Sequence, residues 1–293
     1  MSEVKFNIND LEATEIPDNA YVREKFKTTL INLHRMAPED AESTLEREVI
    51  YFKKALADKG DLKLCTKLTL FSAFLEIAIN NLSIAPGSKS EAYIESRSAN
   101  MGTKTAANWI KVARFVITTY GELNLRIRAG QILRMSNPIV IYNGDTFQPR
   151  TNERGILVID YAPAIPRTSK EIVGAWVAIY LPHDGLDFKW LLVDDIARLK
   201  DYSIPKGASS TAGPNALYSS VNGGIDPGFL ETKTIKHAMR SYTKLKVSGA
   251  AVIDGDHEDD EEAVDYSVKS NTEIEQKQNA VVTIPVETNE EIF

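Results

Sequence analysis

The sequence predicts an α+β fold in which a small antiparallel β-sheet packs against helices and a disordered acidic tail follows. Three observations lead to this prediction. Apolar residues recur at helical spacing in the first third of the chain, short strand-like runs separated by turn signals fill the middle, and the last forty residues are rich in acids. With 293 residues and 43% hydrophobic content, the chain can bury a sizeable core.

The N-terminal part of the chain is predicted to be helical after a flexible segment, residues 1–20. Residues 21–35 and 41–58 have the apolar spacing of amphipathic helices. Residues 69–82 are apolar on almost every side, which is typical of a buried helix. The breaker cluster at residues 83–87 ends that helix.

The next segment is predicted to begin with a short strand, residues 92–95, and to continue as a helix over residues 105–119. In that helix Trp109 falls opposite Lys111, so we expect Trp109 to be a core anchor. Residues 121–129 fit either a strand, by their alternation, or a helix that ends at Gly130.

The middle of the chain is predicted to form hairpins. Asn143-Gly144-Asp145 is a hairpin signal between residues 136–142 and 147–148. Residues 182–185 form a turn between two further strands, and Asp194 or Asp195 is expected to cap a helix that runs to Tyr202. The remaining predicted elements are a strand at residues 156–161, the two strands at 171–181 and 188–193, a loop at 203–228 and a helix at 231–246.

Charge is distributed unevenly. Residues 254–293 contain 13 Asp/Glu and 2 Lys/Arg, whereas residues 1–253 contain 28 and 32, so the formal net charge of −7 combines a tail of −11 with a body of +4. This asymmetry is typical of nucleic-acid binders that carry an acidic arm. We therefore expect one nucleic-acid-binding domain over residues 21–253 and a disordered tail over residues 254–293.

The densest basic stretch runs over residues 104–134, which contain six Lys/Arg and a single acid, Glu122, with aromatic residues among them. Cations neutralise phosphates and aromatic rings stack on bases, so this pattern favours a single-strand surface. A second predicted stripe is Lys233, Lys236 and Arg240, although such cations are often only solvated charges. The candidate DNA-binding residues are Lys104, Lys111, Arg114, Tyr120, Arg126, Arg128, Arg134, Lys233, Lys236, Arg240 and Lys244.

Signatures of enzymes are mostly missing from the sequence. The four histidines have no metal-ligand spacing, so neither a metal nor another cofactor is expected. Asp184, Asp187 and Lys189 match the residue types of metal-dependent nucleases, but Asp is also a common turn former. The N-terminus has no secretory pattern, the single Cys65 fits a reducing compartment, and no apolar run is long enough to span a membrane, so a cytoplasmic protein is expected.

Several segments resemble the RecT family of phage single-strand DNA annealing proteins. The stretch Leu125-Arg126-Ile127-Arg128-Ala129-Gly130-Gln131-Ile132 is similar to the family's helix and Ser-Gly-Gln turn, and Asn143-Gly144-Asp145-Thr146-Phe147 to its Glu-Gly-Asp-x-Phe hairpin. The further matching stretches are residues 84–88 with 91–94, 138–142, 173–178, 188–193 and 232–240. The resemblance covers about residues 71–247 in consistent order.

The sequence also departs from the family pattern. Tyr120 stands where the family has an arginine in Gly-Tyr-Arg-Gly, and Thr232 replaces the first lysine of its Lys-Lys-Thr-x-x-Arg helix. The arginine of that helix corresponds to His237 or, one residue off, to Lys236.

The resemblance implies that residues 121–129 are a helix. It further implies ATP-independent binding of single-stranded DNA and annealing of complementary strands in phage-type homologous recombination, without a covalent catalytic step. The implied partners are single-stranded DNA, further copies of the chain in a ring or filament, a separate phage exonuclease and a host single-strand binding protein. A metal-dependent DNA-processing nuclease and a phage structural or packaging protein remain the alternatives.

Overall fold

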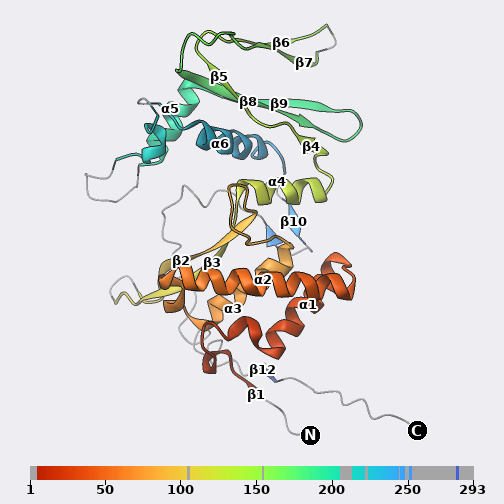
Figure 1. The fold of residues 1–293 in the computed structure, drawn as a ribbon, viewed down its shortest axis with the longest axis vertical. Coiled ribbons are helices and arrows are strands. Elements are labelled where there is room, and N and C mark those ends of the chain that lie inside the picture. The colour runs from red at the N-terminus through yellow and green to blue at the C-terminus, as the bar shows by residue number, and fades with distance from the viewer. Residues whose placement is uncertain are drawn as a thin grey trace. The chain divides into compact units, whose positions relative to one another are not determined.

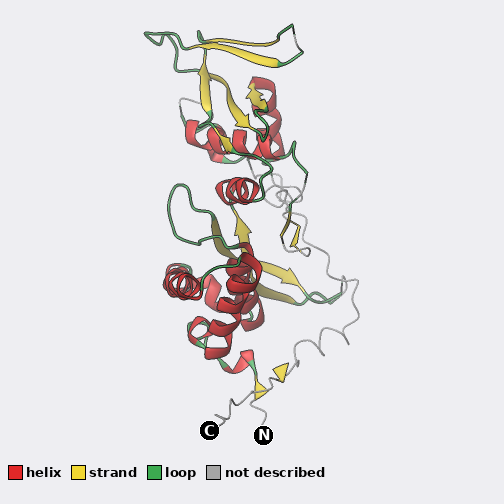
Figure 2. Cartoon of the chain, turned by 90° about the vertical axis from the view of Figure 1, so that its right-hand side faces the viewer, coloured by secondary structure: helices red, strands yellow, loops and turns green. Residues whose placement is uncertain are grey.

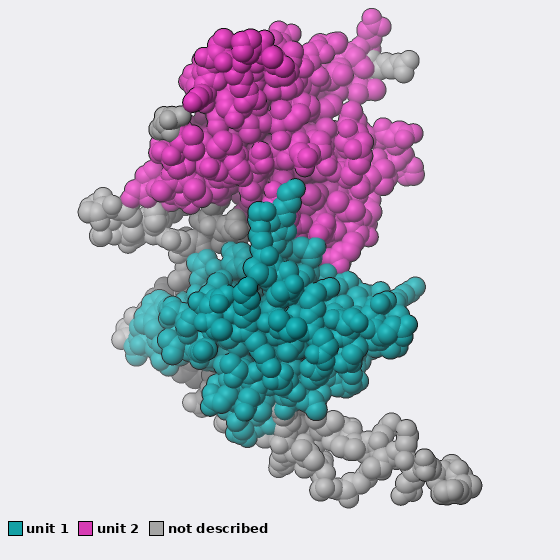
Figure 3. Space-filling model, in the orientation of Figure 1, with its two compact units in different colours: residues 1–116, 263–293 teal, residues 117–262 magenta. Residues whose placement is uncertain are grey.

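The computed structural model describes residues 5–103, 106–153, 155–204, 213–221, 224–243, 245–247, 251–252 and 282–283. Their fold is a mixture of helices and antiparallel strands, which confirms the predicted α+β class (Figure 2). The chain divides into two compact units. Unit 1 contains residues 1–116 and 263–293, and unit 2 contains residues 117–262 (Figure 3).

Three helices form the core of unit 1. They are α1 (Ala20–His34), α2 (Pro38–Asp58) and α3 (Lys67–Asn80), as the apolar spacing predicts. Each contributes a buried phenylalanine: the Phe74 ring lies 4.8 Å from that of Phe26 and 5.0 Å from that of Phe52. Packing of all three helices on this centre explains why α3 is buried on most sides.

Short elements precede α1 and follow α2 in unit 1. The helices η1 (Ile8–Asp10) and η2 (Ile16–Asp18) lie in the segment expected to be flexible, and Ile16 is completely buried, so this segment packs into the unit. The helix η3 (Gly60–Leu64) follows α2. Strand β1 (Lys5–Phe6) pairs with β12 (Val282–Thr283), and the other residues of the predicted acidic tail, 254–293, lie outside the described residues.

A two-stranded sheet, β2 (Ala92–Asn100) with β3 (Trp109–Ile117), completes unit 1. The helix predicted over residues 105–119 is therefore wrong. The backbone of β3 is bound from two sides: besides its pairing with β2, the N-terminal end of α3 contacts it through Thr66 N–H to Lys111 O and Ala113 N–H to Thr69 Oγ1, both 3.0 Å. These partners favour a strand over a helix.

Unit 2 is organised around the long strand β8 (Ile172–Tyr180). Strand β9 (Leu186–Leu192) pairs with it on one side, and β4 (Arg134–Met135) and β5 (Ile139–Tyr142) pair with it on the other. The predicted hairpin of β8 and β9 is confirmed. Helix α5 (Val193–Tyr202) follows at once, but its N-cap is Leu192 and not Asp194 or Asp195, as predicted; Asp195 lies in the first turn, where its carboxylate accepts a hydrogen bond of 3.2 Å from Leu192 N–H.

A second hairpin consists of β6 (Thr146–Thr151) and β7 (Leu157–Ala162). The hairpin predicted across residues 143–145 is wrong, because β5 pairs with β8 and β6 pairs with β7. Asp145 explains the change of direction: its carboxylate accepts hydrogen bonds of 2.9 Å from Tyr142 N–H and 2.8 Å from Ala164 N–H. These bonds hold a tight bend that leads the chain out of the sheet.

Helix α6 (Pro227–Met239) covers one face of the sheet, and the β6–β7 hairpin lies on the other side (Figure 1). Helix α6 begins four residues before the start of the predicted helix, residues 231–246, and ends seven residues before the end of that predicted helix. The remaining elements of unit 2 are α4 (Thr119–Arg128), η4 (Ala216–Tyr218), β10 (Lys246–Val247) and β11 (Ala251–Val252). Helix α4 confirms the helical alternative for residues 121–129.

The core of unit 2 lies between α6 and the sheet. One buried cluster joins Ile235, Ala238 and Met239 of α6 to Val177 and Ile179 of β8. A second joins Leu230 of α6 to residues of β8 and β9, with side chains of α5 against it. Helices α5 and α6 therefore pack on the same face of the sheet. Among the helices that the structure describes, none is both long and apolar enough to cross a membrane.

Candidate nucleic-acid interface

The basic stretch of residues 104–134 does not form one surface in either unit, because the division between the units falls inside it. Lys111 and Arg114 belong to unit 1, whereas Tyr120 and the arginines at 126, 128 and 134 belong to unit 2. Lys104, like Lys244 further along the chain, lies outside the described residues. The local density of bases in the sequence therefore corresponds to two separate sets of side chains.

The unit 1 set is placed on β3. The Lys111 ammonium lies 3.9 Å from the Asp61 carboxylate. The positive charge of Arg114 acts on Glu76 of α3. Burial raises the pKa of Glu76, and the Arg114 charge partly lowers it again. Trp109, expected to be a core anchor, is 59% exposed. That expectation was wrong because residues 109 and 111 lie on the same face of a strand, not on opposite faces of a helix.

Arg126 has a structural role in unit 2. It is only 4% exposed, and its guanidinium binds the buried Glu122 carboxylate, with Nε 2.9 Å and Nη2 2.5 Å from Oε1. Its Nη1 donates to Gln131 Oε1 at 2.7 Å and to the Thr243 carbonyl at 3.1 Å. These bonds tie α4 to the chain after α6. Arg126, a DNA-binding candidate from the sequence, is therefore buried in a structural network and not presented to solvent.

The other candidates near α4 differ in exposure. The Tyr120 ring packs partly buried against the cluster that contains Ile132, whereas Arg128 is exposed at the end of α4. Arg134 is exposed on β4, and its guanidinium lies 3.5 Å from the centre of the Tyr180 ring on β8. A cation held flat on an aromatic ring keeps its edge available to an acceptor.

Helix α6 presents a different set of side chains from the one predicted. Lys236 is only 8% exposed, because neighbouring positions of this helix are buried against the sheet and α4. The residues that share the outer face are Lys233, His237 and Arg240, spaced by four and three residues. We call these three residues the α6 stripe. The helical spacing alone allows either set, so only the burial of Lys236 decides between them.

Two more cations flank the α6 stripe, and neither was among the DNA-binding candidates from the sequence. Lys189 comes from β9 and Arg198 from α5, and the charges of both act on the His237 imidazole. Each also has an acidic neighbour: Lys189 Nζ lies 3.1 Å from Asp187, and Arg198 Nη2 lies 2.8 Å from Asp195. The charges of Arg240, Arg198 and Lys189 and of the acid Asp195 therefore all act on one histidine.

Aromatic residues cover the opposite face of the sheet. The Trp176 ring of β8 lies 5.8 Å from that of Tyr161, 6.0 Å from that of Phe188 and 6.4 Å from that of Phe147. This cluster joins the β6–β7 hairpin to the sheet. The alternation of residues along β8 places Trp176 on the face away from α6, a signal that the sequence analysis did not use.

Near this cluster, the Arg167 guanidinium lies 3.7 Å from the centre of the Tyr142 ring. The Tyr161 hydroxyl donates a 3.1 Å hydrogen bond to Asp145. Burial acts to raise the pKa of Asp145, but the hydrogen bonds that its carboxylate accepts outweigh burial and lower that pKa overall. A second arginine–tyrosine stack therefore lies in unit 2 beside a fixed carboxylate.

The residues proposed for a nuclease lie at the β8–β9 turn. Asp184 occupies the turn itself, with a left-handed φ of 57°, whereas the Asp187 carboxylate accepts a 3.3 Å hydrogen bond from the Tyr242 hydroxyl. In the parts of the chain that the structure describes, no three His, Cys, Asp or Glu side chains are grouped so that they could hold a metal ion.

Comparison of the chain with models of known protein families and with curated proteins finds no match.

Proposed function

We propose that this protein binds single-stranded DNA and anneals complementary strands without ATP, in phage-type homologous recombination. The observation that carries the proposal is the cationic surface around His237, to which α6 contributes Arg240, β9 Lys189 and α5 Arg198, with Lys233 one turn away on α6. Cations grouped in this way can neutralise consecutive phosphates of a strand.

Annealing makes and breaks no covalent bond, so it requires neither a nucleophile nor a bound metal. It requires that the backbone of one strand be neutralised while its bases stay able to pair. Arginine–tyrosine stacks such as Arg134 with Tyr180 suit this task, because an aromatic ring and a guanidinium can stack on any base. The resemblance to the RecT family supports the same function.

The proposal includes partners. Annealing proteins of this kind act as rings or filaments, so one protomer needs to hold only a few nucleotides, and the modest positive charge of residues 1–253 suffices. The exonuclease that supplies the single strand would be a separate chain, and a host single-strand binding protein would be the competitor for that strand.

The test is to mix the full-length protein with two complementary labelled oligonucleotides, without ATP or metal, and to follow annealing and cleavage together. We expect annealing faster than the spontaneous rate and no cleavage. In a parallel mixture with Mg²⁺, cleavage that is lost in Asp187→Asn would instead support the nuclease. Assembly of the protein without salt-sensitive DNA binding would support a structural or packaging protein.

A further inference from the structure

His237 occupies the middle of the α6 stripe. It lies four residues after Lys233 and three before Arg240, so the three side chains follow one another on the outer face of the helix. Its side chain is half-buried, whereas Arg240 is exposed. A histidine between two cations can change the charge of this surface near neutral pH, because imidazole is the one side chain that ordinarily titrates there.

Charged groups from every neighbouring element act on the imidazole. Burial is the main cause that lowers the pKa of His237 below its usual value. Asp195 of α5 raises that pKa, and the positive charges of Arg240, Arg198 and Lys189 lower it. An added negative charge would oppose this lowering and favour the protonated imidazole.

We propose that His237 is a proton-dependent ligand for a backbone phosphate of the bound strand. The imidazole takes up one proton from the solvent when the phosphate binds among Lys189, Arg198 and Arg240, and its second N–H then becomes available as a donor. Strand affinity consequently rises as the pH falls. This inference rests on the proposed function, because it assigns a role within the same surface.

The direction of the effect follows from proton linkage. The phosphate raises the pKa of His237 in the complex, so between the free and the bound pKa the complex holds more protons than its components. In that window the affinity increases by up to about tenfold for each pH unit of decrease, and above the bound pKa it is constant. Since the free pKa is lowered, the window begins below the pKa of an unperturbed histidine and extends upward.

The experiment measures the affinity for fluorescent oligo-thymidine, whose bases do not titrate in this range, from about pH 8 to about pH 5.5 at fixed salt. We expect the unmodified protein to bind more tightly as the pH falls. His237→Gln is neutral at every pH, so it should bind like the unmodified protein at high pH and show no rise. His237→Arg is always charged, so it should bind tightly over the whole range.

His183 provides a matched control. It is exposed in the turn between β8 and β9, so His183→Gln should keep the full pH dependence. Arg198→Gln gives a second readout: removal of its positive charge should weaken binding at high pH and yet move the midpoint of the rise to higher pH. A purely structural role of His237 would not produce that shift.

A measurement on the unmodified protein covers the case in which His237→Gln fails to fold. Calorimetric titration in buffers of different ionisation enthalpy counts the protons that are taken up on binding, and we expect a value between zero and one. A value of zero, or a pH dependence that His237→Gln retains, would overturn the inference while leaving strand binding intact. Failure of the unmodified protein to bind oligo-thymidine at any pH would instead overturn the proposed function.

Discussion

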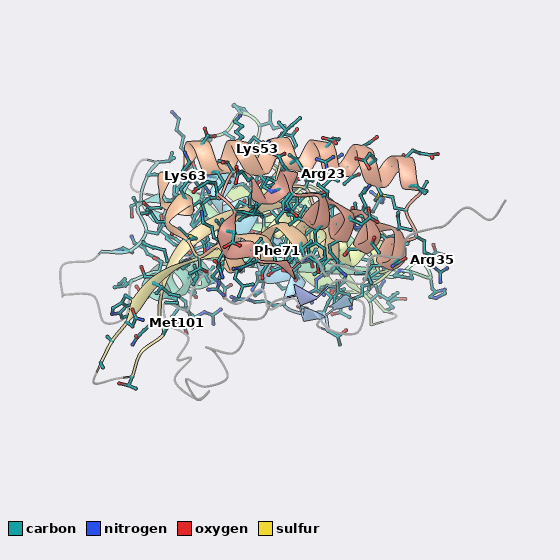
Figure 4. All side chains as sticks on the ribbon, turned by 90° about the horizontal axis from the view of Figure 1, so that it is seen from below. Arg23, Arg35, Lys53, Lys63, Phe71 and Met101 are labelled. Atoms are coloured by element: carbon teal, nitrogen blue, oxygen red, sulfur yellow. The ribbon has the colours of Figure 1, made fainter. Side chains whose placement is uncertain are left out.

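Outside the acidic tail of residues 254–293, the two units differ in their balance of charge. Residues 1–116 contain 16 Lys/Arg and 16 Asp/Glu, whereas residues 117–253 contain 16 and 12. In unit 1 the cations of the helices contact acids of neighbouring elements: Lys27 Nζ lies 3.0 Å from Glu42, and Lys53 Nζ lies 2.5 Å from Asp18. Lys53 lies among the helices of unit 1, and Met101 lies at the end of the β2–β3 hairpin (Figure 4).

In unit 2 some cations lie over aromatic rings, as Lys25 and Lys59 also do in unit 1, and others, such as Lys189 and Arg198, have acidic neighbours. Besides the stacks of Arg134 and Arg167, the Lys233 ammonium lies 5.1 Å from the centre of the Phe229 ring. A ring holds a cation without neutralising it, whereas a carboxylate cancels its charge. The comparison teaches that placement, and not local density along the sequence, decides which cations share a surface.

The largest expected effect concerns the buried ion pair of Arg126 with Glu122 in unit 2. Arg126→Met leaves the buried Glu122 carboxylate without its partner, so we expect the free energy of unfolding to fall by about 3–5 kcal/mol. Urea denaturation measures this change. Arg128→Met, on the exposed side of the same helix, is the matched control and should change that free energy by less than about 0.5 kcal/mol. Equal effects of the two variants would contradict the structural role of Arg126.

The second prediction compares the cations of the two units directly. Replacing Lys189, Arg198 and Arg240 with Gln should weaken single-strand binding and lower the slope of log affinity against log salt by roughly 0.7 for each lost phosphate contact. The matched triple change of Arg23, Lys27 and Lys53 to Gln in unit 1 should leave both quantities unchanged. Anisotropy titrations at several salt concentrations measure them.

If the unit 1 variant lost as much affinity and slope as the unit 2 variant, the assignment of phosphate contacts to the cations around His237 would be contradicted. If neither variant changed the slope, the cations around His237 would be ordinary solvated charges.

The smallest expected effect concerns two aromatic residues. Tyr120 packs against the core of unit 2, so Tyr120→Ala should lower the free energy of unfolding by about 1–3 kcal/mol. Trp109 is mostly exposed on β3, so Trp109→Ala should lower it by less than about 1 kcal/mol. Thermal denaturation followed by circular dichroism compares the two variants. The opposite order would show that the exposures of these side chains are exchanged in solution.

The sequence alone predicts the elements whose patterns are long and whose partners are near along the chain. The three helices of unit 1 follow from apolar residues at helical spacing, and β8 and β9 follow from two strand-like runs joined by a four-residue turn. The acidic first turn of α5 is likewise local, because Asp195 bonds a backbone group only three residues away. In each case the sequence pattern and the tertiary partner favour the same structure.

Other features depend on partners that are distant in the sequence. The segment of β3 fits both a helical and a strand pattern, and its pairing with β2 and α3 decides for the strand. Strand β5 has a good turn signal after it, yet its partner is β8, about thirty residues further on.

The residues of the candidate surface likewise depend on tertiary packing that the sequence alone does not give. The sequence identifies α6 as a basic helix, but a helix packed on most sides exposes only a narrow face. The way in which α6 lies on the sheet buries Lys236 and exposes Arg240, and it places His237 between the cations of three elements. A local pattern fixes the periodicity of a segment, whereas the identity of its exposed side chains depends on what packs against it. That is why the sequence alone predicted the kind of surface and the tertiary structure decided its residues.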